Sequence, residues 1–354
     1  MSKVHNFSAG PAILPQVVLD SCIQALQNFE GTNLSLIEVS HRGKEFVAVM
    51  DEACSLVKKI MRLNDDYDVL FLQGGASMQF LMVSMNLLEN KAAYTNTGTW
   101  AKNAIKEAKA FGKVDVLGSS EDQNFNYIPK DYVIGSDYDY FHCTSNNTIF
   151  GTQMHHFPKC DVPMICDMSS DIFSRELDFT QFDLIYAGAQ KNMGPAGTTL
   201  VVIKKGLLGK VTRYLPTMLD YNTHIKGESM FNTPSVFAVF GCMHTLRWID
   251  EQGLANIEKL NTAKANLLYT EIDTNPNFIG TTAIEDRSKM NICFVMNDAS
   301  FEKEFLQMAE AVGCVGLKGH RSVGGFRASM YNALPLASVQ VLVDTMKNFE
   351  ALKK

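Results

Sequence analysis

The sequence lacks the features that mark membrane, secreted and metal-binding proteins. No apolar run approaches the ~18 to 20 residues of a membrane span, and the N-terminus has no apolar segment like that of a signal peptide. The eight cysteines form no Cys-x-x-Cys pair and no Cys/His metal spacing, and Cys143, Cys166 and Cys293 lie inside apolar runs. These absences predict a cytoplasmic protein with reduced core cysteines, no metal and no membrane segment.

Positive charge is also scarce. The 354 residues include 32 Lys and Arg against 38 Asp and Glu, which gives a net charge of −6. Nucleic-acid-binding proteins usually carry a basic face, so we expect no nucleic-acid partner. With 46% hydrophobic residues, the chain has enough apolar material for one large domain and a smaller one.

Short apolar stretches with helical patterns between them dominate the first two thirds of the chain. The strand-like stretches are 69–72, 92–95, 114–117, 138–144, 163–166, 184–187 and 199–203. This alternation predicts an α/β domain with a mostly parallel sheet. Active groups in such sheets collect at the carboxyl ends of the strands.

The pattern changes from about Leu254, where a long helical pattern runs to Ile272. Strand-like stretches at 291–296 and 314–317 then alternate with helical patterns at 300–312 and 336–352. We therefore predict a smaller C-terminal α+β domain. The expected division is an N-terminal arm at 1–15, a large domain at 16–256 and a small domain at 257–354.

One lysine stands at an unusual place in this pattern. Lys191 lies in a Gly/Pro-rich turn between the apolar runs 184–187 and 199–203, so it should sit at the end of a buried strand. A lysine in a dry pocket has a lowered pKa and can attack aldehydes. A lysine that only caps a hairpin loop is the alternative.

A carboxylate should reach the same edge of the sheet. Asp167 follows the apolar run 163–166 and would emerge beside Lys191. Pyridoxal phosphate enzymes use such a pair, a lysine for the aldehyde and an acid that keeps the pyridine nitrogen protonated. The spacing alone also fits a structural lysine in an anion-binding or dehydrogenase-like α/β protein.

Three further positions could contact a cofactor. Residues 73–77 (Gln-Gly-Gly-Ala-Ser) form a turn between a strand and a helix, which can point amides at a phosphate, although glycines often serve the turn alone. The turn matches neither nucleotide-binding glycine motif. Trp100 could stack on a ring or pack in the core. Thr148 could reach the strand ends or bond within its Asn-rich turn.

Three segments could bind anions. His41, Arg42 and Lys44 precede a helix for which Ser40 is a candidate cap, and a solvated helix start is the alternative interpretation of this cluster. The 319–329 segment holds two arginines and a histidine among glycines, and a solvated hairpin is its alternative. At 232–235, Thr233 as the helix cap and Pro234 at the first helical position are a sufficient structural reason for this sequence. The same arrangement creates a helix N-terminus that could bind a phosphate.

Several long strings together resemble the phosphoserine aminotransferases, class V pyridoxal-phosphate-dependent aminotransferases of fold type I. The strings follow one another in the family's order at 6–11, 41–46, 167–171, 186–197 and 320–329. The resemblance covers most of the chain. It implies the α/β PLP-dependent transferase fold type I, with a mostly parallel mixed sheet in the large domain.

The resemblance also implies a reaction. L-Glutamate and 3-phosphohydroxypyruvate would give 2-oxoglutarate and O-phospho-L-serine by a reversible ping-pong transamination in serine biosynthesis. Action on 4-phosphohydroxy-L-threonine in pyridoxine biosynthesis is left open. The rivals on the same fold are alanine:glyoxylate aminotransferase and cysteine desulfurase. The only late cysteine that could accept sulfur, Cys314, lies in a strand-like run, which disfavours a desulfurase.

By the same resemblance, Lys191 holds the cofactor aldehyde and Asp167 pairs with the pyridine nitrogen. The remaining cofactor contacts would be Ala76, Ser77, Trp100, Thr148, Gln190, Asn232 and Thr233. The substrate's distal anion would meet His41, Arg42, His320 and Arg321, and its α-carboxylate Arg327. Asn232 and Thr233 would reach the cofactor phosphate of a neighbouring subunit, which implies a homodimer with shared sites. Some family members have an arginine at the position of Ser77, so distal-phosphate recognition could differ here.

Overall fold

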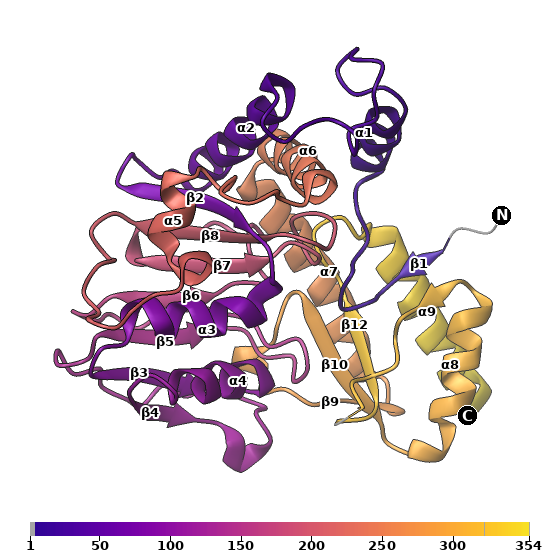
Figure 1. Ribbon diagram of the computed structural model, residues 1–354. Helices are drawn as coiled ribbons and strands as arrows, with labels where there is room; N and C mark the ends of the chain where they lie inside the picture. Colours follow the sequence, from indigo (N-terminus) through magenta and orange to yellow (C-terminus); the bar gives the residue numbers. More distant parts are fainter. Residues whose placement is uncertain (1–3, 322, 354) are drawn as a thin grey trace.

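The computed structural model describes residues 4–321 and 323–353, so Ser322 of the 320–329 string lies outside the described residues. Its largest element is a seven-stranded sheet (Figure 1). In spatial order the strands are β2 (Tyr67–Leu72), β8 (Thr199–Lys204), β7 (Leu184–Gly188), β6 (Met164–Asp167), β5 (Tyr140–Thr144), β3 (Lys91–Asn96) and β4 (Lys113–Ser119). One strand, β8, runs opposite to the other six strands of this sheet. The predicted mostly parallel mixed sheet is confirmed.

Helices cover both faces of this sheet. One face carries α2 (Lys44–Met61) and α6 (Val236–Gln252), with α1 (Gln16–Gln27) packed on α6. The other carries α3 (Gly75–Leu87), α4 (Thr99–Ala108) and the short α5 (Tyr221–Lys226). Successive strand residues point to opposite faces, so Ile165 enters the core under α3 while Cys166 enters the core under α2 and α6. Burial on both faces explains the continuous apolar runs of the strands.

The second part of the molecule, here called the small region, contains a three-stranded antiparallel sheet. Its strands lie in the order β12 (Phe326–Ser329), β10 (Asn291–Met296) and β9 (Phe278–Gly280). The helices α7 (Leu254–Thr274), α8 (Glu302–Ala311) and α9 (Leu336–Lys353) complete it. Helix α7 contributes Ile257 to the core of the large sheet and Leu268 to the core of the small region. We therefore still propose a boundary near residue 257, although α7 itself runs through it.

The N-terminal arm is attached to the small region. Strand β1 (His5–Asn6) pairs in parallel with β11 (Cys314–Val315), and Phe7 is buried in the core of the small region. The strand predicted at 314–317 is thus shorter, because it pairs with the two-residue β1 and not with the small sheet. None of the helices in the described ranges is long and apolar enough to cross a bilayer.

Two predicted helix caps are wrong. Helix α6 begins at Val236 with Ser235 at the N-cap, so Thr233 does not cap it. Ser235 still has non-helical backbone (φ −72°, ψ 85°), so the helix starts one residue later and Pro234 precedes its N-cap. Helix α2 begins at Lys44 behind Gly43, since Ser40 instead closes a turn in which its carbonyl accepts the Gly43 N–H at 2.9 Å.

Candidate active site

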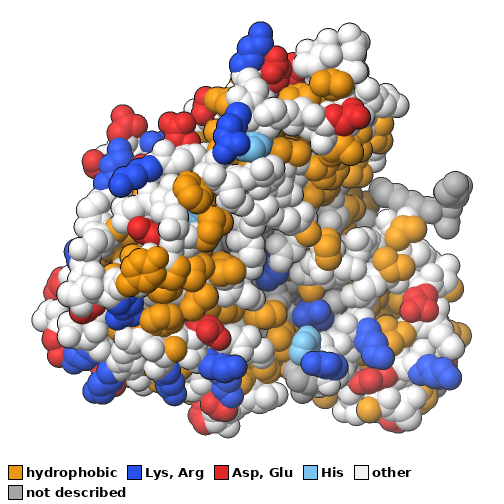
Figure 2. Space-filling model, in the orientation of Figure 1, with side chains coloured by type: hydrophobic (Ala, Val, Ile, Leu, Met, Phe, Trp, Pro, Cys, Tyr) orange, Lys and Arg blue, Asp and Glu red, His pale blue; other side chains and the backbone are white. Residues whose placement is uncertain are grey.

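One cavity lies where the carboxyl ends of the central strands meet the arm and the small region. Its volume is about 370 Å³. The molecular surface is hollowed between its larger and smaller parts, and Lys, Arg and His side chains show at the margin of the hollow (Figure 2). The sequence-predicted residues that line the cavity are Ala76, Ser77, Trp100, Thr148, Asp167, Gln190, Lys191, His320 and Arg327.

Lys191 enters the cavity from the turn after β7. Its Nζ lies 5.8 Å from the centre of the Trp100 ring, and no described residue accepts a hydrogen bond from it. Burial lowers the lysine's pKa to about 8, against the opposing effect of the Asp167 charge. The arm passes close by at Gly10, where an added Cβ would lie 3.4 Å from Lys191 Cγ and φ is +140°. Lys191 is therefore a confined amine that faces an open space, not a solvated loop cap.

Asp167 lies at the end of β6 with only 4% of its surface exposed. Burial raises the pKa of its carboxyl group, while hydrogen bonds from Ser169 and the charge of Lys191 oppose the shift. Ser169 holds the carboxylate through its backbone N–H, which donates to Asp167 Oδ1 at 2.9 Å. A cation beside Asp167 would favour its ionised form. The site thus suits a protonated ring nitrogen.

Backbone donors reach the cavity at the N-terminal end of one helix. Gly74 (φ +96°) ends the turn after β2 and stands at the N-cap of the 13-residue helix α3, so Ala76 and Ser77 lie in the first turn of that helix. Free N–H groups and the helix dipole at this position favour an anion. A phosphate can therefore be held at this end.

Trp100, Thr148 and Arg327 form one wall. The Trp100 indole Nε1–H donates to Thr148 Oγ1 at 3.0 Å, so the threonine hydroxyl keeps its own hydrogen to donate elsewhere. Arg327, on β12, donates from Nη1 to the Thr148 carbonyl at 3.0 Å. The buried Nε of Arg327 has no partner. The arginine is thus fixed by one nitrogen and retains donors for a carboxylate.

The comparisons with known proteins agree with this arrangement. A sequence model described as "Aminotransferase class-V" matches residues 4–342. The chain belongs to the class-V aminotransferases. The family resemblance found in the sequence is therefore confirmed.

Individual class-V aminotransferases match over nearly the whole chain. The phosphoserine aminotransferase of Flavobacterium johnsoniae is 60% identical over 353 residues, 99% of either chain. That of Parabacteroides distasonis is 57% identical over 98% of this chain and 99% of its own. Among solved structures, phosphoserine aminotransferase from Bacillus circulans subsp. alkalophilus matches with a TM-score of 0.96 at 43% identity, over 99% of both chains. The predicted fold type is confirmed.

A more distant aminotransferase shares only the architecture. Alanine–glyoxylate aminotransferase from Nostoc matches with a TM-score of 0.76 at 15% identity, over 98% of this chain and 95% of its own. Identity this low shows the fold and gives no information on substrate.

Five predicted residues of this class-V aminotransferase do not line the cavity. His41 is buried with Nε2 unpaired, and burial and the neighbouring Arg42 lower its pKa. Asn232 instead borders a second cavity of about 290 Å³ and donates to Gln73 Oε1 at 2.9 Å. Arg42, Thr233 and Arg321 are exposed. The single chain therefore does not bring His41, Arg42, Asn232, Thr233 and Arg321 into its own cavity.

The structure adds lining residues that the sequence reasoning missed. Asn146, Ser169 and Ser170 border the cavity, together with Ala9 and Gly10 of the arm. A usable signal existed for Asn146, because it follows directly after a predicted strand. Ser169 and Ser170 belong to the 167–171 string, from which only Asp167 was predicted as a site residue.

Proposed function

We propose that this chain is a pyridoxal-phosphate-dependent phosphoserine aminotransferase. It exchanges an amino group between L-glutamate and 3-phosphohydroxypyruvate, giving 2-oxoglutarate and O-phospho-L-serine, a step of serine biosynthesis. The observation that carries the proposal is the joint presence of Lys191 and Asp167 on one cavity, in a chain 60% identical to a curated phosphoserine aminotransferase. A solved relative at 36% identity, from Trichomonas vaginalis, is described as bound to pyridoxal phosphate.

The donor set of the cavity fits pyridoxal phosphate. Lys191 would hold the aldehyde carbon, Asp167 the pyridine nitrogen, and Trp100 the face of the ring. Thr148 has a hydroxyl hydrogen to donate to the ring oxygen, and the first turn of α3 with Gln190 would hold the phosphate. When bound, the cofactor supplies an electron sink for the pair left behind by the broken Cα–H bond.

The protein's own contribution to the reaction is the movement of one proton. Lys191 Nζ would take the proton from the Cα of the amino-acid substrate as general base and would give it up again as general acid within the same half-reaction. A pKa of about 8 leaves part of the lysine population uncharged at neutral pH, ready to accept that proton. Asp167 stays ionised opposite a positive ring nitrogen and so stabilises the charge that develops in the ring.

Substrate selection follows from the charges around the cavity. Glutamate and phosphoserine each carry an α-carboxylate and a distal anion, so one set of cationic residues serves both half-reactions. Arg327 would bind the α-carboxylate with the donors that Thr148 does not use. His320 lies on the same cavity and would meet the distal anion. The predicted contribution of Arg321, His41 and Arg42 requires that they reach a cavity which they do not line in the single chain.

We further propose a homodimer with shared sites, located in the cytoplasm. Two of the residues that miss the cavity are close in sequence to large exposed apolar side chains: Ile37, 63% exposed, precedes His41, and Phe231, 47% exposed, precedes Asn232. Apolar exposure of this kind favours association. A second subunit would then bring Asn232 and Thr233 to a cofactor phosphate. All eight cysteines are free, in keeping with a reducing compartment.

Half-reaction spectroscopy tests the function. Glutamate added to the purified holoenzyme should change the cofactor absorption and release one equivalent of 2-oxoglutarate. Addition of 3-phosphohydroxypyruvate should restore the absorption and yield phosphoserine, and 4-phosphohydroxythreonine can be assayed in the same way. Faster turnover with alanine and glyoxylate would contradict the proposal. A desulfurase activity is disfavoured, since Cys314 is buried in β11 and burial raises its pKa to about 11.

A further inference from the structure

A buried network of amide and hydroxyl groups links Asn146, which lines the cavity, to the small region. Its central contact is Asn146 Nδ2, which donates to Asn291 Oδ1 at 2.7 Å across 145 positions of sequence. Asn146 follows β5 and lines the cavity, whereas Asn291 is the first residue of β10. Both side chains are buried, at 2% and 0% exposure. The pair therefore holds the seven-stranded sheet and the three-stranded sheet together beside the active site.

Every hydrogen-bonding atom of the Asn146 amide is used. Nδ2 also donates to Ser170 Oγ at 2.8 Å, and Oδ1 accepts from Ser288 Oγ at 2.6 Å. Ser170 in turn donates to the Asn146 carbonyl at 2.8 Å. Because no atom is spare, rotation of the amide by a half-turn would set donors against donors and acceptors against acceptors. The contact has a single satisfied geometry.

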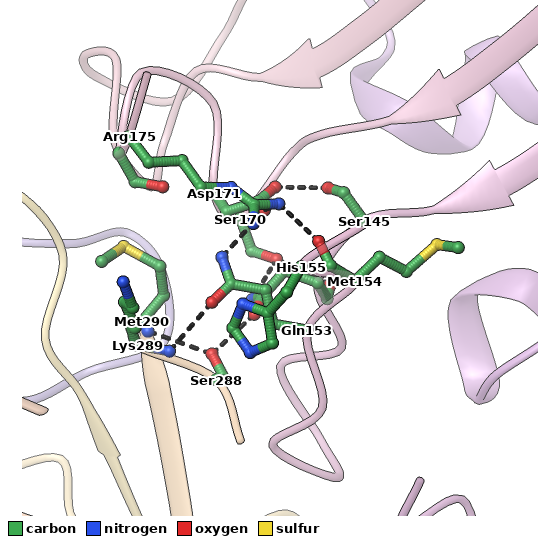
Figure 3. A network of polar contacts seen from close by, with 12 residues as sticks. Ser145, Gln153, Met154, His155, Ser170, Asp171, Arg175, Ser288, Lys289 and Met290 are labelled. Carbon is green, nitrogen blue, oxygen red and sulfur yellow. Dashed lines mark hydrogen bonds and ion pairs between the residues drawn. The ribbon is translucent and has the colours of Figure 1, made fainter. Parts of the chain in front are cut away.

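The same network continues behind the cavity around Asp171. Figure 3 shows Ser145 and Gln153 on the Asp171 carboxylate, with Arg175 reaching it at 3.3 Å. Gln153 also accepts the backbone N–H of Lys289 at 3.0 Å, next to Ser288. This part provides rigid support for the 145–146 turn and for the start of β10.

Asn291 extends the link to β12 and to the arm. Its Nδ2 donates to Ser329 Oγ at 2.9 Å and to the Tyr331 hydroxyl at 3.2 Å. Tyr331 then donates to the carbonyl of Ala9 at 2.8 Å, and Ala9 lines the cavity. Ser329 and Arg327 are two residues apart on β12 and so point to the same face of its sheet. A shift of Asn291 would move Arg327 relative to Lys191.

We propose that Asn291 is a positioning residue. It sets the distance between Arg327 and Lys191, and thereby the affinity for the substrate's carboxylate. The proposal rests on the function proposed above. Asn291 does not line the cavity, so it acts through Asn146 on one side and through Ser329 and Tyr331 on the other. Its loss should weaken carboxylate binding without changing the environment of the cofactor ring.

The test compares Asn291→Ala with Asn275→Ala. Asn275 is also buried and donates to Glu271 Oε1 at 2.8 Å and to the Met346 carbonyl at 3.2 Å, but these partners all lie within the small region. Both variants should melt at lower temperature than the wild type. Only Asn291→Ala should raise KM for glutamate and Ki for glutarate, by about tenfold, the size expected when one charge-assisted hydrogen bond to the carboxylate is weakened. Cofactor absorption and kcat should stay near the wild-type values.

Two further measurements keep the outcome decisive. Tyr331→Phe removes a single oxygen and should give the same pattern more weakly if Asn291→Ala does not fold. Hydrogen exchange at 6–10 and 326–329 should quicken in the Asn291 and Tyr331 variants and not in Asn275→Ala. Equal effects at positions 275 and 291, or altered absorption with unchanged KM, would overturn the proposal. If the wild type does not use glutamate, the function fails, yet glutarate binding and hydrogen exchange still decide the role of Asn291.

Discussion

Among the residues that the structure describes, two lysines have a pKa lowered by burial, and Lys191 is the one that borders the active-site cavity. Lys191 borders the cavity and makes no hydrogen bond to the described residues, and its pKa is lowered to about 8. Lys264, on α7, is 1% exposed and donates to the carbonyls of Met330 at 3.0 Å and Tyr331 at 2.8 Å. Burial lowers its pKa further, to about 7.

The difference shows that a lowered pKa does not by itself identify a reactive lysine. Lys264 has the lower pKa, yet both hydrogens of its neutral amine are engaged and only 1% of its surface is exposed. Lys191 has room for a substrate and no competing acceptor. Access and unused bonding capacity therefore separate the chemical lysine from the structural one.

Replacement of Lys191 should have the largest effect. Lys191→Ala removes both the amine that holds the cofactor and the general base, so kcat should fall by about 10³-fold or more. Borohydride reduction of the wild-type holoenzyme, followed by peptide mass spectrometry, should place the cofactor on Lys191 and leave Lys264 unmodified. A reducible adduct elsewhere in Lys191→Ala would argue against the assignment.

Removal of the charge of Asp167 should be the next largest effect. Asp167→Asn keeps the shape of the side chain but loses the anion that stabilises a protonated ring nitrogen, so kcat should fall by about 10²-fold. The exposed Asp298, which caps a short helix in the small region, gives a matched control, and Asp298→Asn should change kcat by less than about twofold. Comparable losses in both variants would contradict a specific role for Asp167.

The sequence was sufficient to predict the neighbourhood of Lys191 because that neighbourhood is local. Asp167 and Lys191 each follow a buried strand, and parallel strands bring their carboxyl ends to one edge. Lys264 could not be recognised in the same way. It lies in a helical pattern, where a lysine is expected to face solvent. Its burial depends on packing against the 330–331 segment, which the local sequence does not indicate.

Other parts of the site depend on long-range contacts and escaped prediction for that reason. The Asn146–Asn291 bond joins residues 145 positions apart, and the arm reaches the cavity by pairing with β11. His41 and Arg42 were predicted as site residues from the family resemblance, yet the single chain does not bring them to the cavity. Sequence pattern locates strand ends, whereas it does not determine which distant segments meet there.

The pH dependence of labelling gives a third, intermediate test of the two lysines. An amine reacts with aldehydes in its neutral form, so reductive methylation of Lys191 in cofactor-free protein should rise with pH around a midpoint near 8. Lys264 should be mostly neutral at that pH but stay unlabelled, because nothing can reach it. Mass spectrometry of the two peptides from pH 6.5 to about 9 measures both. Equal labelling would show that access does not distinguish them.

Replacement of Lys264 should have the smallest effect on activity and a measurable effect on stability. Lys264→Met leaves two buried carbonyls without a donor, which costs about 1–3 kcal/mol in the free energy of unfolding, while kcat should change by less than about threefold. The folded-state pKa of about 7 lies below the unfolded value, so the unfolded chain binds more protons between pH 7 and about 10. The stability supplied by Lys264 therefore rises with pH in that window. Urea unfolding should accordingly show a smaller gap between wild type and Lys264→Met at pH 6.5 than at pH 9, and the opposite trend would mean that the carbonyls favour the charged ammonium.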